Sequence, residues 1–169
     1  MNHPFEPFIP KNAKYLLLGS FPGQEQTTGT IKDDSWYYGN SRNQFWLFLE
    51  EVYATSLKSK FDKQRLFEAL NMAITDVFSS IIRKRDSSLD KDIDLEKSTY
   101  NDIVIAKILS ENHIEKVFCT SRFVEQIFNK RFPAYKAIYL PSPSRRNATM
   151  SRDEKVQEYI RLLPLHEKL

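Results

Sequence analysis

Three segments far apart in the sequence hold the residue types that a site for a flat, polar heterocycle needs. The first is a glycine- and proline-containing turn at residues 19–23, directly after an apolar run. The second, residues 37–46, gathers aromatic rings, a glycine and carboxamides, which can stack on a heterocycle and exchange hydrogen bonds with it. The third, residues 140–147, adds small hydroxyls and two arginines. Together the segments favour an enzyme that acts on a base drawn out of DNA.

Composition is that of an ordinary globular protein. The 169 residues are 41% hydrophobic and 28% charged, so we expect a single domain over residues 1–169 with its own core. No apolar run approaches the roughly 20 residues that span a membrane, and residues 1–7 lack the order of a signal peptide. A lone cysteine, Cys119, excludes an internal disulfide and a multi-thiolate metal site. We therefore expect a cytoplasmic protein.

The charge pattern gives weak support for a polyanionic partner. The net charge is +3, and basic residues cluster at 83–85, 130–131 and 145–146. Solvated loop charge explains each cluster about equally well.

The elements that must position these segments alternate between apolar runs and amphipathic stretches. We expect strands at 14–19, 72–77, 115–120 and 137–140, and helices at 43–53, 63–70, 101–112, 122–129 and 150–163. Ser41 and Ser151 are the expected N-caps of the first and last helix, and the polar segment 83–97 reads as a long surface loop. This order predicts an α/β fold, a three-layer α/β/α sandwich with a short four-stranded parallel sheet. Ligands bind outside the carboxyl ends of such strands, where the first and third segments would meet.

At these segments the sequence resembles the uracil-DNA glycosylase superfamily. The resemblance spans about residues 14–161, including segment 73–77, which sits where these enzymes place their second strand. It is nearest to the mismatch-specific uracil-DNA glycosylases and closer still to the hypoxanthine-DNA glycosylases. The residues that carry it are Gly19-Ser20-Phe21-Pro22-Gly23, Tyr38-Gly39-Asn40-Ser41-Arg42-Asn43-Gln44-Phe45-Trp46 and Leu140-Pro141-Ser142-Pro143-Ser144.

The sequence departs from the mismatch-specific pattern at two positions. Phe21 stands where those enzymes carry the asparagine that positions the attacking water, and Ser142 stands at another asparagine position. The hypoxanthine-type branch uses an asparagine of the Asn-x-Phe-Trp string instead, which implies a catalytic role for Asn43. Its carboxamide oxygen would hold the water while its NH₂ contacts the base. The alternative is a helix-terminal residue that satisfies local backbone groups.

The resemblance and the chemistry together suggest two binding sets. Backbone N–H groups of the turn would stabilise the anionic leaving base, Tyr38 would stack on it, and Gly39 would allow close backbone approach. Core packing and a plain turn remain alternatives for Tyr38 and Gly39, and Phe45 and Trp46 are expected in the core. The expected base-binding residues are Ser20, Phe21, Pro22, Gly23, Tyr38 and Gly39. The expected DNA-binding residues are Ser142, Ser144, Arg145, Arg146 and Asn147.

Two further residue types, aspartate and histidine, are able to take part in catalysis or metal binding. Asp76, at a predicted strand end, can activate water, but capping of the next turn is the more common role of such a residue. His3, His113 and His166 lack the spacing of metal ligands, so no metal and no cofactor are expected.

The sequence thus predicts a monofunctional DNA glycosylase that removes a deaminated base, hypoxanthine or uracil, from double-stranded DNA. We expect a monomer that does not bind membranes. With no lysine in the matched motifs, no strand cleavage through a Schiff base is expected. The alternative is a non-catalytic nucleic-acid-binding module with a degenerate pocket. A nucleotide-binding enzyme of small metabolites is disfavoured because phosphate-loop and dinucleotide-binding glycine motifs are absent.

Overall fold

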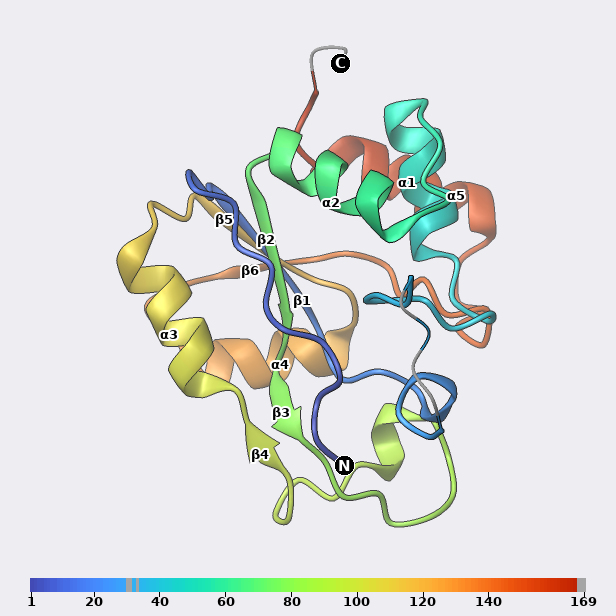
Figure 1. The fold of residues 1–169 in the computed structure, drawn as a ribbon, viewed down its shortest axis with the longest axis vertical. Coiled ribbons are helices and arrows are strands. Elements are labelled where there is room, and N and C mark those ends of the chain that lie inside the picture. Colours follow the sequence, from blue (N-terminus) through green and yellow to red (C-terminus); the bar gives the residue numbers. More distant parts are fainter. Residues whose placement is uncertain (30–31, 33, 167–169) are drawn as a thin grey trace.

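A four-stranded parallel sheet forms the centre of the protein (Figure 1). The computed structural model describes residues 1–29, 32 and 34–166. All neighbouring strands of this sheet are parallel. The strands, in spatial order, are β2 (Met72–Asp76), β1 (Tyr15–Gly19), β5 (Lys116–Cys119) and β6 (Ala137–Tyr139).

Helices cover both faces of the sheet, which confirms the expected three-layer sandwich (Figure 1). Helices α1, α2 and α5 pack on one face, and α3 and α4 pack on the other. None of the helices in the described part of the chain is long and apolar enough to cross a membrane. The bounds are α1 (Phe45–Tyr53), α2 (Lys60–Ala69), α3 (Asp102–Glu111), α4 (Arg122–Arg131) and α5 (Arg152–Leu162).

Strand β1 contributes to the cores on both faces. Leu17 packs with α1, α2 and α5, whereas Leu16 and Leu18 pack with α3 and α4. All three leucines are fully buried, because side chains alternate across a strand and helices cover both sides. This is why the sequence reads as a continuous apolar run rather than an alternating one.

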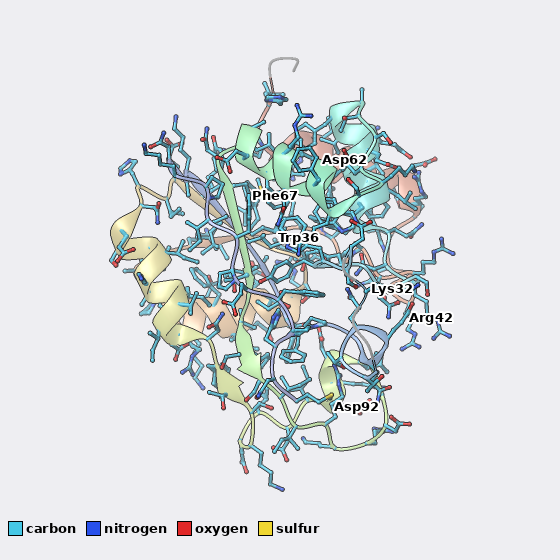
Figure 2. The ribbon with its side chains drawn as sticks, viewed as in Figure 1. Lys32, Trp36, Arg42, Asp62, Phe67 and Asp92 are labelled. Carbon is cyan, nitrogen blue, oxygen red and sulfur yellow. The ribbon has the colours of Figure 1, made fainter. Side chains whose placement is uncertain are left out.

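Aromatic rings fix the segment before α1 against the sheet. Trp36 stacks on Trp46 at a centroid distance of 5.5 Å and meets Phe67 of α2 edge-on at 5.7 Å. Figure 2 shows Trp36 and Phe67, which both belong to the core between the sheet and helices α1, α2 and α5. The indole N–H of Trp46 donates to the carbonyl of Tyr37 at 2.7 Å. The expectation that Phe45 and Trp46 belong to the core is confirmed.

One expected helix cap is confirmed and one is wrong. Ser151 caps α5 in a reciprocal capping box with Glu154. Ser41 does not cap α1, which begins only at Phe45; the hydroxyl of Ser41 donates to Glu25 instead. The carboxamide oxygen of Asn43 accepts the N–H of Phe45 at 2.9 Å, so Asn43 supplies the hydrogen bond expected of Ser41.

The segment 83–97 is more ordered than the expected surface loop. It contains the 3₁₀ helix η2 (Asp90–Asp92), and both Asp92 and Ile93 are only 2% exposed. The Asp92 carboxylate accepts a charged hydrogen bond from Arg85 at 2.7 Å, which offsets part of the desolvation cost of burying Asp92. A small antiparallel sheet of β3 (Phe78–Ser80) and β4 (Thr99–Tyr100), which was not predicted, flanks the segment.

Candidate active site

A cavity of about 820 Å³ opens at the carboxyl ends of the parallel strands. β1 lies between β2 and β5, so the strand order changes direction at β1. Open α/β sheets bind their ligands at such a topological switch point. The volume is within the range of about 300–1,000 Å³ typical of small-molecule sites. The lining residues that follow the strand ends are Ser20, Phe21, Pro22 and Gly23 after β1, Asp76 of β2, Thr120 and Ser121 after β5, and Ser142, Pro143 and Ser144 after β6.

The turn after β1 lines the cavity and has backbone donors that no group in the described part of the chain accepts. Within residues 1–29, 32 and 34–166, no group accepts a hydrogen bond from the N–H of Ser20, Phe21 or Gly23. The turn is supported from outside, because Arg83 donates to the carbonyl of Pro22 at 3.3 Å. All four expected turn residues, Ser20 to Gly23, line the cavity. Such fixed donors can bind an oxygen or ring nitrogen on which negative charge develops.

Tyr38 lines the cavity in a left-handed backbone conformation, with φ of 56°. Its ring lies 4.2 Å from that of Phe45, so one face is covered and a ligand could stack only on the other. Its hydroxyl and the Thr120 hydroxyl are 3.0 Å apart, within hydrogen-bond distance. Burial, its largest cause, and the nearby Asp76 charge raise the pKa of Tyr38 well above its usual range. The hydroxyl therefore stays protonated near neutral pH.

Gly39 does not line the cavity. A Cβ at this position would lie 2.7 Å from Nε2 of Gln26 and 2.9 Å from the carbonyl oxygen of Trp36. Gln26, in the 3₁₀ helix η1 (Gln24–Gln26), donates to that same carbonyl at 2.8 Å. The backbone of Gly39 therefore lies close to Gln26. The prediction that Gly39 binds the base is not supported by the cavity, because Gly39 is not among the lining residues.

Asn43 lines the cavity, but its carboxamide oxygen is engaged at the start of α1. The segment around it pairs with the loop after β6. Asn43 forms an isolated antiparallel β-bridge with Ser144, and the N–H of Gln44 donates to the carbonyl of Pro143 at 2.9 Å. In the described part of the chain, no group accepts a hydrogen bond from the Asn43 NH₂. The geometry therefore makes Asn43 a donor toward a ligand more readily than an acceptor for water.

The loop after β6 is held in place by α5. Lys155, only 3% exposed, donates from Nζ to the carbonyl of Asn147 at 2.6 Å, and burial lowers its pKa. The hydroxyl of Tyr159 donates to the carbonyl of Pro141 at 2.8 Å. Of the predicted DNA-binding residues, the lining contains Ser142, Ser144, Arg146 and Asn147 but not Arg145.

The cavity rim carries exposed cations that sequence reasoning only partly identified. Arg42, which reaches outward in Figure 2, and Arg122 are both exposed and both belong to the lining, as does Arg146. The guanidinium of Arg122 lies 3.8 Å from the ring centroid of Tyr139. Exposed cations of this kind attract a polyanion, although Arg122 is also paired with Glu125 at 2.7 Å.

The cavity also contains carboxylates that sequence reasoning missed or left open. Asp76 lines it and accepts a hydrogen bond from His3 Nε2 at 2.8 Å. Asp90 of η2 lines it as well and accepts a hydrogen bond from the Ser20 hydroxyl at 2.7 Å. The strand-end position marked Asp76 in advance, whereas nothing in the sequence pattern marked His3 or Asp90. In the described residues, no group of three or more His, Cys, Asp or Glu side chains is arranged to hold a metal ion.

Comparison with known proteins finds the same architecture in a solved structure. The solution NMR structure of a "putative Uracil DNA glycosylase from Methanosarcina acetivorans" superposes with a TM-score of 0.69 at 20% sequence identity, over 95% of each chain. The two proteins share one fold. No protein-family model and no curated protein sequence matches the chain.

Proposed function

We propose that the protein is a monofunctional DNA glycosylase that hydrolyses the N-glycosidic bond of a deaminated base flipped out of double-stranded DNA. One observation carries the proposal: the Ser20–Gly23 turn, in which the N–H groups of Ser20, Phe21 and Gly23 have no acceptor in the described part of the chain, lines one cavity together with Tyr38 and Asn43. They do so at the carboxyl edge of the sheet, in a fold shared with a protein described as a "putative Uracil DNA glycosylase".

The donors suit the departure of a base. Cleavage of the N-glycosidic bond gives an anionic leaving base and a cationic sugar, so donors must face the base in a water-poor pocket. Loss of one such donor typically raises the barrier by about 3–4 kcal/mol. The N–H groups of Phe21 and Gly23 and the Asn43 NH₂ supply three donors of this kind.

The rim suits the DNA backbone. Arg42, Arg122 and Arg146 are cationic, and Ser142 and Ser144 present hydroxyls beside them. Contacts of this type fix a duplex without reading its sequence. Extruding a base costs a few kcal/mol and is cheapest at a lesion or mismatch, which favours a damaged base as substrate. We expect Arg145 to contribute less to DNA binding than Arg146, because Arg145 does not line the cavity.

The sequence resemblance supports the hypoxanthine-type branch within this proposal. Phe21 is 7% exposed and packs edge-on against His3 at 5.1 Å, so it forms an apolar wall where mismatch-specific enzymes place an asparagine. We therefore propose hypoxanthine ahead of uracil as the preferred base.

A non-catalytic nucleic-acid-binding module is the second candidate. It is favoured by one observation, the engagement of the Asn43 carboxamide oxygen with the N–H of Phe45. A residue whose oxygen caps a helix is less free to hold an attacking water.

Duplex oligonucleotides that carry a single hypoxanthine, uracil or xanthine test the two candidates. After incubation, alkali converts abasic sites to strand breaks, which the glycosylase predicts for at least one lesion and which Asn43→Ala should strongly reduce. Asn12→Ala, an exposed asparagine outside the lining, is the matched control and should keep full activity. Lesion binding without breaks on any substrate would instead establish the binding module.

A further inference from the structure

Asp76 is a buried carboxylate in the wall of the cavity. It ends β2 in register with Gly19 at the end of β1, and only 4% of its surface is exposed. It nevertheless belongs to the cavity lining. Burial of a carboxylate is costly unless the group is paired and hydrogen-bonded, so the partners of its two oxygens define what it can do.

His3 holds one of these oxygens. The N-terminal segment runs beside β3, where the N–H of His3 donates to the carbonyl of Ser79 at 2.9 Å. The imidazole Nε2 donates to Oδ2 of Asp76 at 2.8 Å, and its Nδ1 lies 2.8 Å from the carbonyl oxygen of Phe5. Phe21 packs edge-on against the same ring. The imidazole is therefore held on several sides and restrains Oδ2 of Asp76.

The other oxygen is left for a ligand. In the described part of the chain, no group donates a hydrogen bond to Oδ1 of Asp76. A Cβ at Gly19 would lie 2.4 Å from this oxygen and 2.6 Å from the hydroxyl of Tyr38. Oδ1 of Asp76 and the hydroxyl oxygen of Tyr38 therefore both lie close to Gly19, next to the turn that carries the free N–H donors. The Tyr38 hydroxyl already has Thr120 as its partner.

Resting on the glycosylase function proposed above, we propose that Asp76 is a catalytic carboxylate that holds and deprotonates the attacking water, and that His3 is its positioning residue. A carboxylate accepts a proton far more readily than a carboxamide. Asp76 lines the cavity, and its Oδ1 receives no hydrogen bond in the described part of the chain. Asn43 then serves as a donor to the base, which agrees with its engaged oxygen and unused NH₂.

The reaction balances with these groups alone. The bond between C1′ of the sugar and the base nitrogen breaks, and its electron pair leaves with the base. The water oxygen forms a new bond to C1′, while Asp76 takes the proton that the water loses. That proton then passes to the departed base, so one water is consumed and an abasic sugar and a neutral base are formed. The carboxylate charge also stabilises the positive charge that develops on the sugar.

The titratable groups that surround Asp76 come from different elements. They are His3 of the N-terminal segment, Tyr37 and Tyr38 before α1, and Asp90 of η2. Burial, ahead of the Asp76 charge, raises the pKa of both tyrosines, so they remain neutral. The cavity wall therefore places the Asp76 carboxylate beside tyrosines that carry no charge, and a carboxylate suits a cationic transition state.

Single-turnover cleavage of hypoxanthine and uracil duplexes between acidic and neutral pH tests the assignment. General-base catalysis contributes about 10²–10⁴-fold, so Asp76→Asn should lower the rate by that factor and abolish its rise with pH, with lesion affinity changed by less than about 3-fold. His3→Gln retains an N–H donor and should lose less rate than His3→Ala, and both should alter the pH profile. Asp153→Asn, whose side chain is 94% exposed, is the control and should match the wild type.

Each outcome decides a separate point. A wild type that binds lesions and cleaves none refutes the glycosylase function and, with it, this role. An active wild type whose Asp76→Asn variant cleaves within about 3-fold of the same rate refutes the role of Asp76 alone. If Asp76→Asn does not fold, as judged by its thermal transition, the two His3 variants decide, since identical rates and pH profiles for His3→Ala and wild type would also refute it.

Discussion

The hydroxyl of Ser20 donates to Oδ1 of Asp90 at 2.7 Å and so joins the turn after β1 to the segment that follows β3. Burial, the largest cause, raises the pKa of Asp90, and the nearby Asp76 charge adds to this effect. The Ser20 hydrogen bond and the Arg83 charge act in the opposite direction without cancelling it. The pairing therefore shapes the cavity and leaves a carboxyl group that resists ionisation.

This environment predicts a pH-dependent gain in stability for Asp90→Asn. A carboxyl whose pKa is higher in the folded than in the unfolded state keeps its proton longer when folded. Wild-type stability then falls as the pH rises from the unfolded value, about 4, toward the folded one, whereas the asparagine variant lacks this fall. Urea unfolding across this range should show a difference that grows with pH and then levels off. Parallel stability curves for the two proteins would contradict the prediction.

Lys155→Met should loosen the loop after β6. The ammonium group of Lys155 satisfies the carbonyl of Asn147 at 2.6 Å, and methionine keeps the apolar stem while removing the donor. A buried acceptor left unpaired costs about 1–3 kcal/mol, so the unfolding free energy should fall by that amount. Duplex affinity should fall with it, because the loop carries Ser144 and Arg146. Lys107→Met, an exposed lysine on α3, should change neither quantity.

Local sequence patterns were sufficient for the sheet and its helices. The runs at Leu16–Leu18 and Ala73–Ile74 are continuous because helices cover both faces of the strands, and this signal needs no partner to interpret. The capping box of Ser151 with Glu154 is equally local and was predicted correctly at Ser151. The turn after β1 reached the cavity as expected, because strand order alone fixes which loops share the carboxyl edge.

Long-range pairing decided the parts that sequence patterns could not reach. His3 meets Asp76, and Ser20 meets Asp90, across 73 and 70 residues respectively. No periodicity in the polar segment 83–97 indicates that Asp90 turns inward. Asn43 lies just before α1 because its segment pairs with Ser144, and that pairing displaced the helix start from the expected residue 43 to Phe45.

Gly19→Ala should impair activity more than its small size suggests. The added Cβ would lie 2.4 Å from Oδ1 of Asp76 and 2.6 Å from the Tyr38 hydroxyl, so at least one of these groups must move. Overpacking of this kind costs about 1–3 kcal/mol of stability. Single-turnover rates on a lesion duplex should fall at temperatures where thermal unfolding shows the variant to be folded. Unchanged rates and stability would contradict the prediction, because they would mean that Asp76 and Tyr38 move away from the added Cβ at no measurable cost.

Asn43→Ser separates the capping role of Asn43 from its role as a donor. Serine can still accept the N–H of Phe45, whereas it lacks the NH₂ group that asparagine brings to the cavity lining. We expect the unfolding free energy to stay close to that of the wild type, while Asn43→Ala loses about 1 kcal/mol as a lost cap. Both variants should lose base excision to a similar extent. A serine variant that retains full activity would assign Asn43 to capping only.

Arg146→Ala and Arg145→Ala should differ in their effect on DNA binding, because only Arg146 lines the cavity. An arginine that neutralises a phosphate releases about one counterion, so its loss weakens binding to all duplexes and reduces the salt slope by about 1. We expect this reduction for Arg146→Ala and a smaller one for Arg145→Ala. Fluorescence anisotropy with undamaged and lesion duplexes at several salt concentrations measures both slopes, and Arg65→Ala, on exposed α2 surface, sets the baseline. Equal slopes for Arg146→Ala and this baseline would remove Arg146 from the DNA footprint, and a larger effect at Arg145 would shift the duplex path away from the cavity rim.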